Sequence, residues 1–378
     1  MRTTSPTFER RRRLADPIRH LDPVLIGAVL ALSVIGLLAV YSATHSSLRS
    51  AGLDPTFYLR RQAIWVALGI VLASGVMAID YRRIRDTTAI WYGLSVLLLL
   101  LVISPLGVTT QGAQRWVNLG FFQLQPSEFA EVALVLLLAS WCHMHEELTG
   151  GRFVGALVLA GVPALLVLTQ PDLGTALVFG VVAIAVTFFG GARLRHLAAV
   201  GLVVAFAVIA GLSLGVLEDY QRDRLTGFVN PQGDSSSVYN LTQSQIALGA
   251  GGLTGVGLFQ GTQTNLSFVP EQHTDFIFTV IGEELGFLGT ATVVTLFAVV
   301  AWRVWRAALV ARDRFGALLC VGVLAMMVFK IFQNIGMTMQ MMPITGIPLP
   351  FLSYGGSATL ASFIAVGLVL NVGSRRFT

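Results

Sequence analysis

Ten apolar segments, each close to the length that crosses a bilayer, dominate this chain of 378 residues. A membrane-spanning helix needs about 20 predominantly apolar residues. Charged residues make up only 12% of the chain, about half of the share in a typical soluble domain, so too little polar surface is present for a water-soluble body. We therefore predict an all-α polytopic membrane protein. The expected spans are residues 24–41, 62–79, 88–106, 126–144, 153–168, 173–189, 196–216, 276–302, 317–340 and 357–372.

The arginines predict how these spans are oriented. Cytoplasmic loops carry an excess of Lys and Arg over external loops. With the N-terminus inside, the inner segments hold eighteen arginines and the outer segments hold six, so both termini are expected in the cytoplasm. The basic run Arg10 to Arg13 precedes the first span, where it would meet anionic lipid head groups. The net charge of +5 is therefore assigned to contact with membrane lipids and not with nucleic acid.

The domain organisation is expected to be simple. Residues 1–23 are predicted to form a basic interfacial segment on the cytoplasmic side, and residues 24–378 to form one transmembrane domain. The longest connection, about residues 217–275, lies outside in this topology and is rich in Gly, Ser, Gln and Asn. Long ordered loops are usually functional, and this one is expected to carry short helices or re-entrant pieces. No convincing internal repeat is present, which argues against an inverted-repeat transporter.

Charged side chains crowd the entry to the eighth span. Glu271, His273 and Asp275 stand within five positions, directly before a long apolar run. Asp275 has the position of a helix cap, and a carboxylate at this place also suits a general base that the neighbouring histidine tunes; the two roles do not exclude each other. The two acids and the histidine are also a candidate site for a divalent cation, although their spacing matches no specific metal signature. These roles stay open at this point.

Four further polar residues of the expected outer face are candidates for substrate contact. Arg115 is one of the few outer arginines, and its planar guanidinium suits a diphosphate. Trp116 beside it is also typical of an interfacial aromatic belt. Glu128 lies in the first turn of the fourth span, where the helix dipole favours a carboxylate. Asp172 lies in the turn that opens the sixth span, so a helix cap is the alternative interpretation.

Polar groups inside the expected spans need partners. Intramembrane acids such as Glu283 and Glu284 are functional sites by default, with a structural ion pair as the alternative. Lys330, the only lysine, or a nearby arginine is expected to neutralise one of them. The glycine-rich run 247–261 lacks the Gly-Lys-Ser/Thr ending of a nucleotide-binding P-loop and is interpreted as a flexible turn.

The segment Met342–Ser357, between the ninth and tenth spans, contains three prolines and three glycines. This composition forbids a continuous helix. Non-helical backbone at membrane depth is tolerated only against protein or beside a wet cavity. We therefore predict a re-entrant element that lines a cavity.

Together these motifs resemble the SEDS family (shape, elongation, division and sporulation), and specifically its RodA branch. The resemblance extends over almost the whole chain. The sequence of Met342–Pro350, together with Gly-Thr-Gln at 261–263, resembles sequences of the elongation branch, RodA, more than those of the division branch, FtsW. The matching segments are 20–23, 112–116, 125–128, 170–175, 219–222, 261–263, 270–278 and 342–357.

This resemblance implies a ten-helix peptidoglycan glycosyltransferase, a hexosyltransferase of the bacterial cytoplasmic membrane. It would polymerise lipid II, the undecaprenyl-diphosphate-linked disaccharide peptide, into β-1,4 glycan strands on the outer face during cell elongation. A class B penicillin-binding protein, which crosslinks the glycan, and other elongation-complex proteins would be its partners. The alternatives are a lipid II flippase and a non-catalytic scaffold of the elongation complex.

The resemblance also implies roles for individual residues. The family's essential aspartate falls on Asp275, the expected general base of an inverting, single-displacement reaction. Lysines often found in the family are replaced here by Glu131, Gln245 and Val256. An arginine or a divalent cation (Mg or Mn) is therefore expected at the diphosphate, while no resident metal ligand and no certain cofactor are assigned. The expected substrate-binding residues are Arg115, Trp116, Glu128, Asp172, Arg222, Glu271 and His273.

Overall fold

The computed structural model describes residues 20–110, 113–118, 120, 122–213, 236–266 and 268–376. Most of the predicted N-terminal segment, part of the large loop and the predicted binding residue Arg222 therefore lie outside the described residues.

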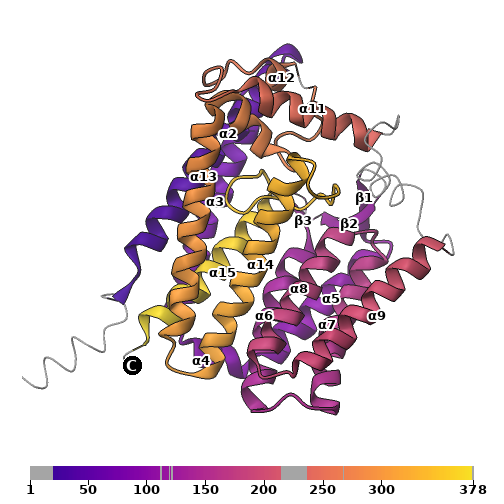
Figure 1. The fold of residues 1–378 in the computed structure, drawn as a ribbon. Coiled ribbons are helices and arrows are strands. Elements are labelled where there is room, and N and C mark those ends of the chain that lie inside the picture. Colours follow the sequence, from indigo (N-terminus) through magenta and orange to yellow (C-terminus); the bar gives the residue numbers. More distant parts are fainter. Residues whose placement is uncertain are drawn as a thin grey trace, which may run out of the picture.

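The body of the protein is a bundle of apolar helices (Figure 1). Seven of the described helices are long and apolar enough to cross a membrane, and three apolar helices are shorter. The seven are α2 (Pro23–Ser50), α3 (Phe57–Ala78), α6 (Pro126–Met144), α7 (Gly151–Leu168), α13 (Ile277–Leu309), α14 (Arg314–Thr338) and α15 (Gly356–Ser374). The shorter three are α5 (Thr88–Ile103), α8 (Leu173–Phe189) and α9 (Leu194–Ser213).

Each of these helices coincides with one expected span, so the predicted class of polytopic helical membrane protein is confirmed. The number of membrane crossings and the side on which the termini lie stay predictions. Helix α2 ends at Ser50, nine residues beyond the expected span, because the apolar run marks only the part suited to the bilayer and not the end of the helix.

Helix α14 connects two groups of helices. It packs against α13 on one side and against α6 and α8 on the other. On the side of α13, α2 packs against α13, and α15 packs against α3. On the other side, α5 packs against α6, and α7 against α8. A residue of α14 can therefore contact both groups.

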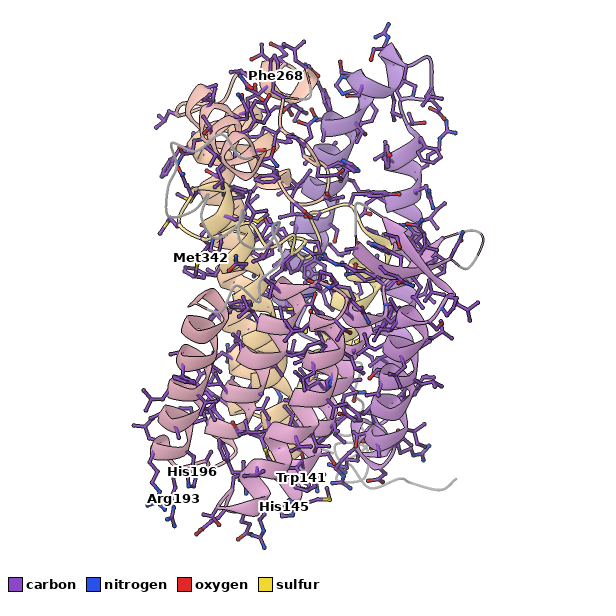
Figure 2. All side chains as sticks on the ribbon, turned by 90° about the vertical axis from the view of Figure 1, so that its right-hand side faces the viewer. Trp141, His145, Arg193, His196, Phe268 and Met342 are labelled. Atoms are coloured by element: carbon purple, nitrogen blue, oxygen red, sulfur yellow. The ribbon has the colours of Figure 1, made fainter. Side chains whose placement is uncertain are left out.

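The two ends of the bundle differ. Helices α11 (Ser236–Ala250) and α12 (Thr262–Asn265) cover the end that we call the upper end (Figure 1). Phe268 lies there, whereas Trp141, His145, Arg193 and His196 lie at the opposite, lower end (Figure 2). The short helix α4 (Tyr81–Asp86) is at the lower end. The helices α11 and α12 confirm the short helices expected in the large loop.

A small antiparallel sheet follows α5 and was not predicted. Its strands β1 (Gly107–Thr110), β2 (Ala113–Asn118) and β3 (Gln123–Leu124) pair in the order β1-β2-β3. Trp116 lies opposite Val108, and the register shifts between Val108 and Thr109. The sheet packs against α5 and the start of α6, so it places Arg115 and Trp116 beside the upper part of the bundle.

Beyond the end of α11 the glycine-rich run forms turns, as predicted, and its backbone is hydrogen-bonded to α13. Helix α13 breaks at Gly286, whose φ of +64° is left-handed. The backbone of the glycine-rich run supplies the missing hydrogen bonds: Val256 N–H donates to Glu283 O at 3.0 Å, and Phe287 N–H donates to Gly252 O at 2.9 Å. A buried backbone needs such partners, so the run fastens the large loop to the break in α13.

Candidate active site

Asp275 lies in a turn at the upper end, directly before α13. That helix begins at Ile277 and its N-cap residue is Phe276, so Asp275 does not occupy the N-cap position considered for it. The Asp275 N–H donates to Glu271 O at 3.0 Å. Glu271 itself has a φ of +50°, which is uncommon for a residue with a side chain. The turn is thus tightly folded, and it presents a half-buried Asp275.

Asn334 of α14 holds this turn from below. Its side-chain amide donates to Asp275 O at 2.9 Å and to Ile347 O at 2.8 Å, and Asn334 is completely buried. One amide group therefore fastens both the Asp275 turn and the segment between α14 and α15 to the same helix. Asn334 was not assigned to the site from the sequence; an asparagine in an apolar span is the sequence feature that points to such a buried contact.

The segment between α14 and α15 is non-helical and largely buried, as predicted. Its backbone is held by side chains: Gln333 donates to Pro343 O at 2.9 Å, and Gln62 donates to Ser353 O at 3.1 Å. A Cβ added at Gly346, whose φ is +70°, would lie 3.3 Å from the Asp275 carboxylate. The glycine therefore lets the segment approach Asp275 closely. The cavity expected beside it stays a prediction.

Arg115 and Asp172, far apart in sequence, lie together. Arg115 Nε donates to Gln170 O at 3.1 Å, and its guanidinium also contacts Pro171 O and lies 3.8 Å from the Asp172 carboxylate. Asp172 caps α8 as expected, accepting from Thr175 N–H at 3.1 Å. Both side chains are mostly buried. In this structure Arg115 therefore joins the sheet to α8.

The Asp172 turn and the Asp275 turn meet at the segment between α14 and α15. A Cβ added at Gly174, two residues after Asp172, would come within 2.8 Å of Thr345 O. Thr345 directly precedes Gly346, which borders the Asp275 carboxylate. Three predicted site residues are thus arranged around one part of the upper end: Arg115, Asp172 and Asp275.

Lys330 forms a buried ion triad with two acids of α6. Its Nζ lies 2.7 Å from Glu128 Oε2 and 2.6 Å from Glu131 Oε2, and none of the three side chains is more than 5% exposed. Lys330 and Asn334 are one helical turn apart, so both lie on the same face of α14. The predicted residue Glu128 therefore connects α6 to the helix that holds the Asp275 turn.

The expectation that Lys330 or an arginine neutralises Glu283 or Glu284 is wrong. Glu283 instead accepts the N–H groups at the start of α12, from Gln263 at 2.8 Å and Thr264 at 2.9 Å. Glu284 accepts the hydroxyl of Ser42. Free N–H groups at a helix start favour a carboxylate, so the two acids hold α12 and α2 to α13.

Glu271 and His273 line a different wall of the site. They border a cavity of about 260 Å³ between α2, α3 and residues 269–273, and Asp275 is not among its lining residues. The His273 ring lies 4.9 Å from Tyr58 and 5.6 Å from Tyr354, centroid to centroid. Among the described residues no group of three or more His, Cys, Asp or Glu could hold a metal ion, so the cation site considered for Glu271, His273 and Asp275 is not formed.

The environment of His273 predicts a pH-dependent stability. Burial lowers the pKa of His273, and the Glu271 carboxylate opposes this only in part. Below about pH 6.5, the ordinary pKa of histidine, residue 273 therefore binds more protons in the unfolded chain than in the folded protein. The contribution of the neutral His273 side chain to the free energy of unfolding is complete above that pH. It is lost as the pH falls towards the lower pKa that His273 has in the folded protein. Between pH 7.5 and pH 5, the Tm of His273→Gln is expected to fall about 1–4 °C less than that of the wild type.

Thermal unfolding of the purified protein at both pH values measures this difference. His145→Gln, at the lower end, is the matched control and is expected to keep the full wild-type fall in Tm. An equal fall for His273→Gln and the wild type would show that His273 does not contribute to the pH dependence.

Comparison with known proteins assigns the family. Residues 23–377 match the family of FtsW, RodA and SpoVE, described as "Cell cycle protein". The chain belongs to this family. The peptidoglycan glycosyltransferase MrdB of Escherichia coli K12 is 36% identical over 94% of this chain and 94% of its own, and relatives named FtsW from Geobacter reach similar identity. Family membership therefore agrees with the sequence resemblance, and these relatives carry names from more than one branch.

Solved structures agree in fold. A structure titled "Structural coordination of polymerization and crosslinking by a peptidoglycan synthase complex" has a TM-score of 0.80 at 31% identity, covering 94% of this chain and 98% of its own. The crystal structure of the rod shape determining protein RodA of Thermus thermophilus has a TM-score of 0.70 at 29% identity, covering 95% and 98%. The fold described above is therefore the fold of this family.

Proposed function

We propose that this multi-pass membrane protein is a peptidoglycan glycosyltransferase that polymerises lipid II. The observation that carries the proposal is the Asp275 carboxylate, held half-buried at the upper end by a turn that Asn334 fixes from within the bundle. Relatives over almost the whole chain carry the name peptidoglycan glycosyltransferase, and this supports the same reaction here.

In the proposed reaction Asp275 is the general base. It accepts the proton of the acceptor sugar's 4-hydroxyl while that oxygen attacks the anomeric carbon of the donor. The new glycosidic bond forms as the bond from that carbon to the diphosphate breaks, and undecaprenyl diphosphate leaves. A single displacement converts the α-linked donor into a β-1,4 product, which is the logic of inverting enzymes.

The leaving diphosphate is the second requirement, because negative charge develops on it during the displacement. We assign its neutralisation to positive charge at the upper end, with Arg115 beside Asp172 as the described candidate and Arg222 as a further one. Mg or Mn is the alternative to an arginine here, and it would be bound in part by the oxygens of the diphosphate itself. Trp116, Glu271 and His273 are proposed to contact the sugar and peptide parts of the substrate.

The upper end is proposed to face outward from the bacterial cytoplasmic membrane, with both termini inside. The excess of arginines in the opposite loops supports this orientation. A class B penicillin-binding protein is the proposed partner, supported by the similar structure whose title couples polymerisation with crosslinking. The resemblance of the segment Met342–Pro350 to the elongation branch of the family supports a role in cell elongation.

The flippase alternative is less well supported. It would need polar side chains along a path through the bundle. Glu283, Glu284, Lys330, Gln333 and Asn334 all make hydrogen bonds or ion pairs within the protein instead. These contacts hold helices to one another and to the non-helical segments.

The test is the formation of glycan strands from purified lipid II. The protein is reconstituted with its penicillin-binding partner, whose crosslinking serine is blocked. We expect glycan polymer that lengthens with time and depends on this chain. Transfer of lipid II across the membrane without polymer would support the flippase, and neither activity in a well-folded complex would support the scaffold.

A further inference from the structure

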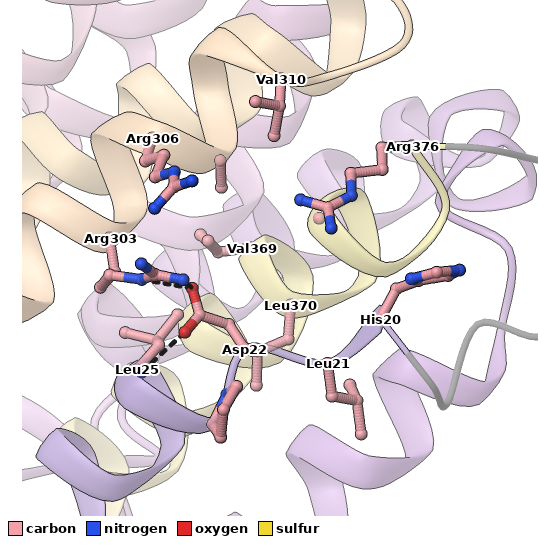
Figure 3. Close-up of a pocket in the computed structure, with 13 residues that line it drawn as sticks. His20, Leu21, Asp22, Leu25, Arg303, Arg306, Val310, Val369, Leu370 and Arg376 are labelled. Carbon is pink, nitrogen blue, oxygen red and sulfur yellow. Dashed lines mark hydrogen bonds and ion pairs between the residues drawn. The ribbon is translucent and has the colours of Figure 1, made fainter.

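A second cavity lies at the lower end, far from Asp275. It measures about 230 Å³ and is bordered by the start of α2, the end of α13 and the end of α15 (Figure 3). The site described above lies at the upper end of the same bundle. The function proposed for the Asp275 site therefore does not explain this lower cavity.

Positive charge dominates this lower cavity. Arg303, Arg306 and Arg376 line it, and Asp22 is the one acidic residue among the lining residues. Asp22 is already engaged: it accepts the N–H groups of Val24 and Leu25 at 3.1 Å and pairs with Arg303 at 2.5 Å. Three arginines and one aspartate among the described lining residues give the cavity a formal net positive charge.

Apart from His20, the other lining residues are apolar. Figure 3 shows Arg306 and Arg376 on opposite sides of the cavity, with Val369 and Leu370 between them. Outside it, α13 exposes Trp302 and Leu309 to its surroundings. In a membrane protein such a surface faces acyl chains. A cationic cavity therefore lies beside the lipid-facing surface of α13.

We propose that this cavity binds the phosphate head group of an anionic phospholipid, with the acyl chains lying along α13. Guanidinium groups match phosphate oxygens in bidentate geometry. Basic pockets between membrane helices on the cytoplasmic side are suited to anionic head groups. Soluble phosphate would gain from the two arginines but not from the adjoining apolar surface, so the combination favours an amphiphile.

The test titrates the purified full chain in detergent with phosphatidylglycerol, phosphatidylcholine or inorganic phosphate, and counts bound molecules by native mass spectrometry. We expect one phosphatidylglycerol per chain, bound about tenfold or more tightly than phosphatidylcholine because only the former carries a net charge. Arg306→Gln and Arg376→Gln are each expected to weaken phosphatidylglycerol binding by about fivefold or more. Both arginines are exposed, so neither change removes a core contact.

Arg312→Gln is the matched control, because Arg312 is an exposed arginine between α13 and α14 that does not line the cavity. It is expected to bind phosphatidylglycerol as the wild type does. Three results would overturn the proposal: equal binding of the two lipids, equal loss in Arg312→Gln, or no loss in either cavity variant. Arginine-dependent binding of inorganic phosphate that displaces the lipid would assign the cavity to a soluble phosphate instead.

Discussion

Replacement of Asp275 by alanine is expected to lower the rate of glycan polymerisation by about 10²–10⁴-fold, the usual contribution of a general base. The loss should appear in kcat, because the carboxylate acts on the proton in transit and not on the bound lipid. The measurement is the initial rate of strand formation from lipid II with the reconstituted complex. A rate within a few-fold of wild type would remove Asp275 from the proposed chemistry.

Two further variants separate chemistry from folding. Asp275→Asn keeps the size of the side chain and leaves the backbone carbonyl free to accept from Asn334, so it is expected to fold normally and to be as inactive as the alanine variant. Asp54→Asn removes an exposed carboxylate of the upper end that pairs only with its neighbours Thr56 and Arg60 among the described residues. This control is expected to polymerise at the wild-type rate. Equal losses in both asparagine variants would indicate a general effect of charge at this end.

The helices were predictable because apolar runs of bilayer length admit few other structures. The position of Asp275 before the eighth span and the non-helical segment between α14 and α15 also followed from the sequence. The sheet β1–β3 did not, because its short strands carry polar residues and no clear alternation. Its formation depends on packing against α5 and α6, and a single sequence does not record such contacts.

The partners of buried charges were the main failure of sequence reasoning. Helical spacing states which residues share a face, but it does not state which helix that face meets. Lys330 was therefore assigned to the acids of α13, although α14 turns it towards Glu128 and Glu131 of α6. The same limitation concealed the role of Asn334, whose two acceptors lie 59 and 13 residues away in sequence.

Replacement of Lys330 by methionine is expected to destabilise the folded protein by about 3–5 kcal/mol, because it leaves two buried carboxylates without their cation. Glu131→Gln keeps the Glu128–Lys330 pair and is expected to cost much less. Thermal unfolding in detergent measures both. Since Lys330 and Asn334 share one face of α14, any Lys330→Met protein that still folds is expected to polymerise lipid II more slowly through a displaced Asp275 turn.

Exchange of the charges provides the decisive comparison. Lys330→Glu alone gathers three buried carboxylates and is expected to prevent folding, whereas the combination with Glu131→Lys again places one lysine between two acids. We expect the double variant to recover at least about half of the lost stability, since contacting residues are energetically coupled. Recovered stability with recovered polymerisation would show that the triad acts by positioning α14. Recovered stability without polymerisation would show that the charges at positions 131 and 330 affect the reaction beyond their effect on stability.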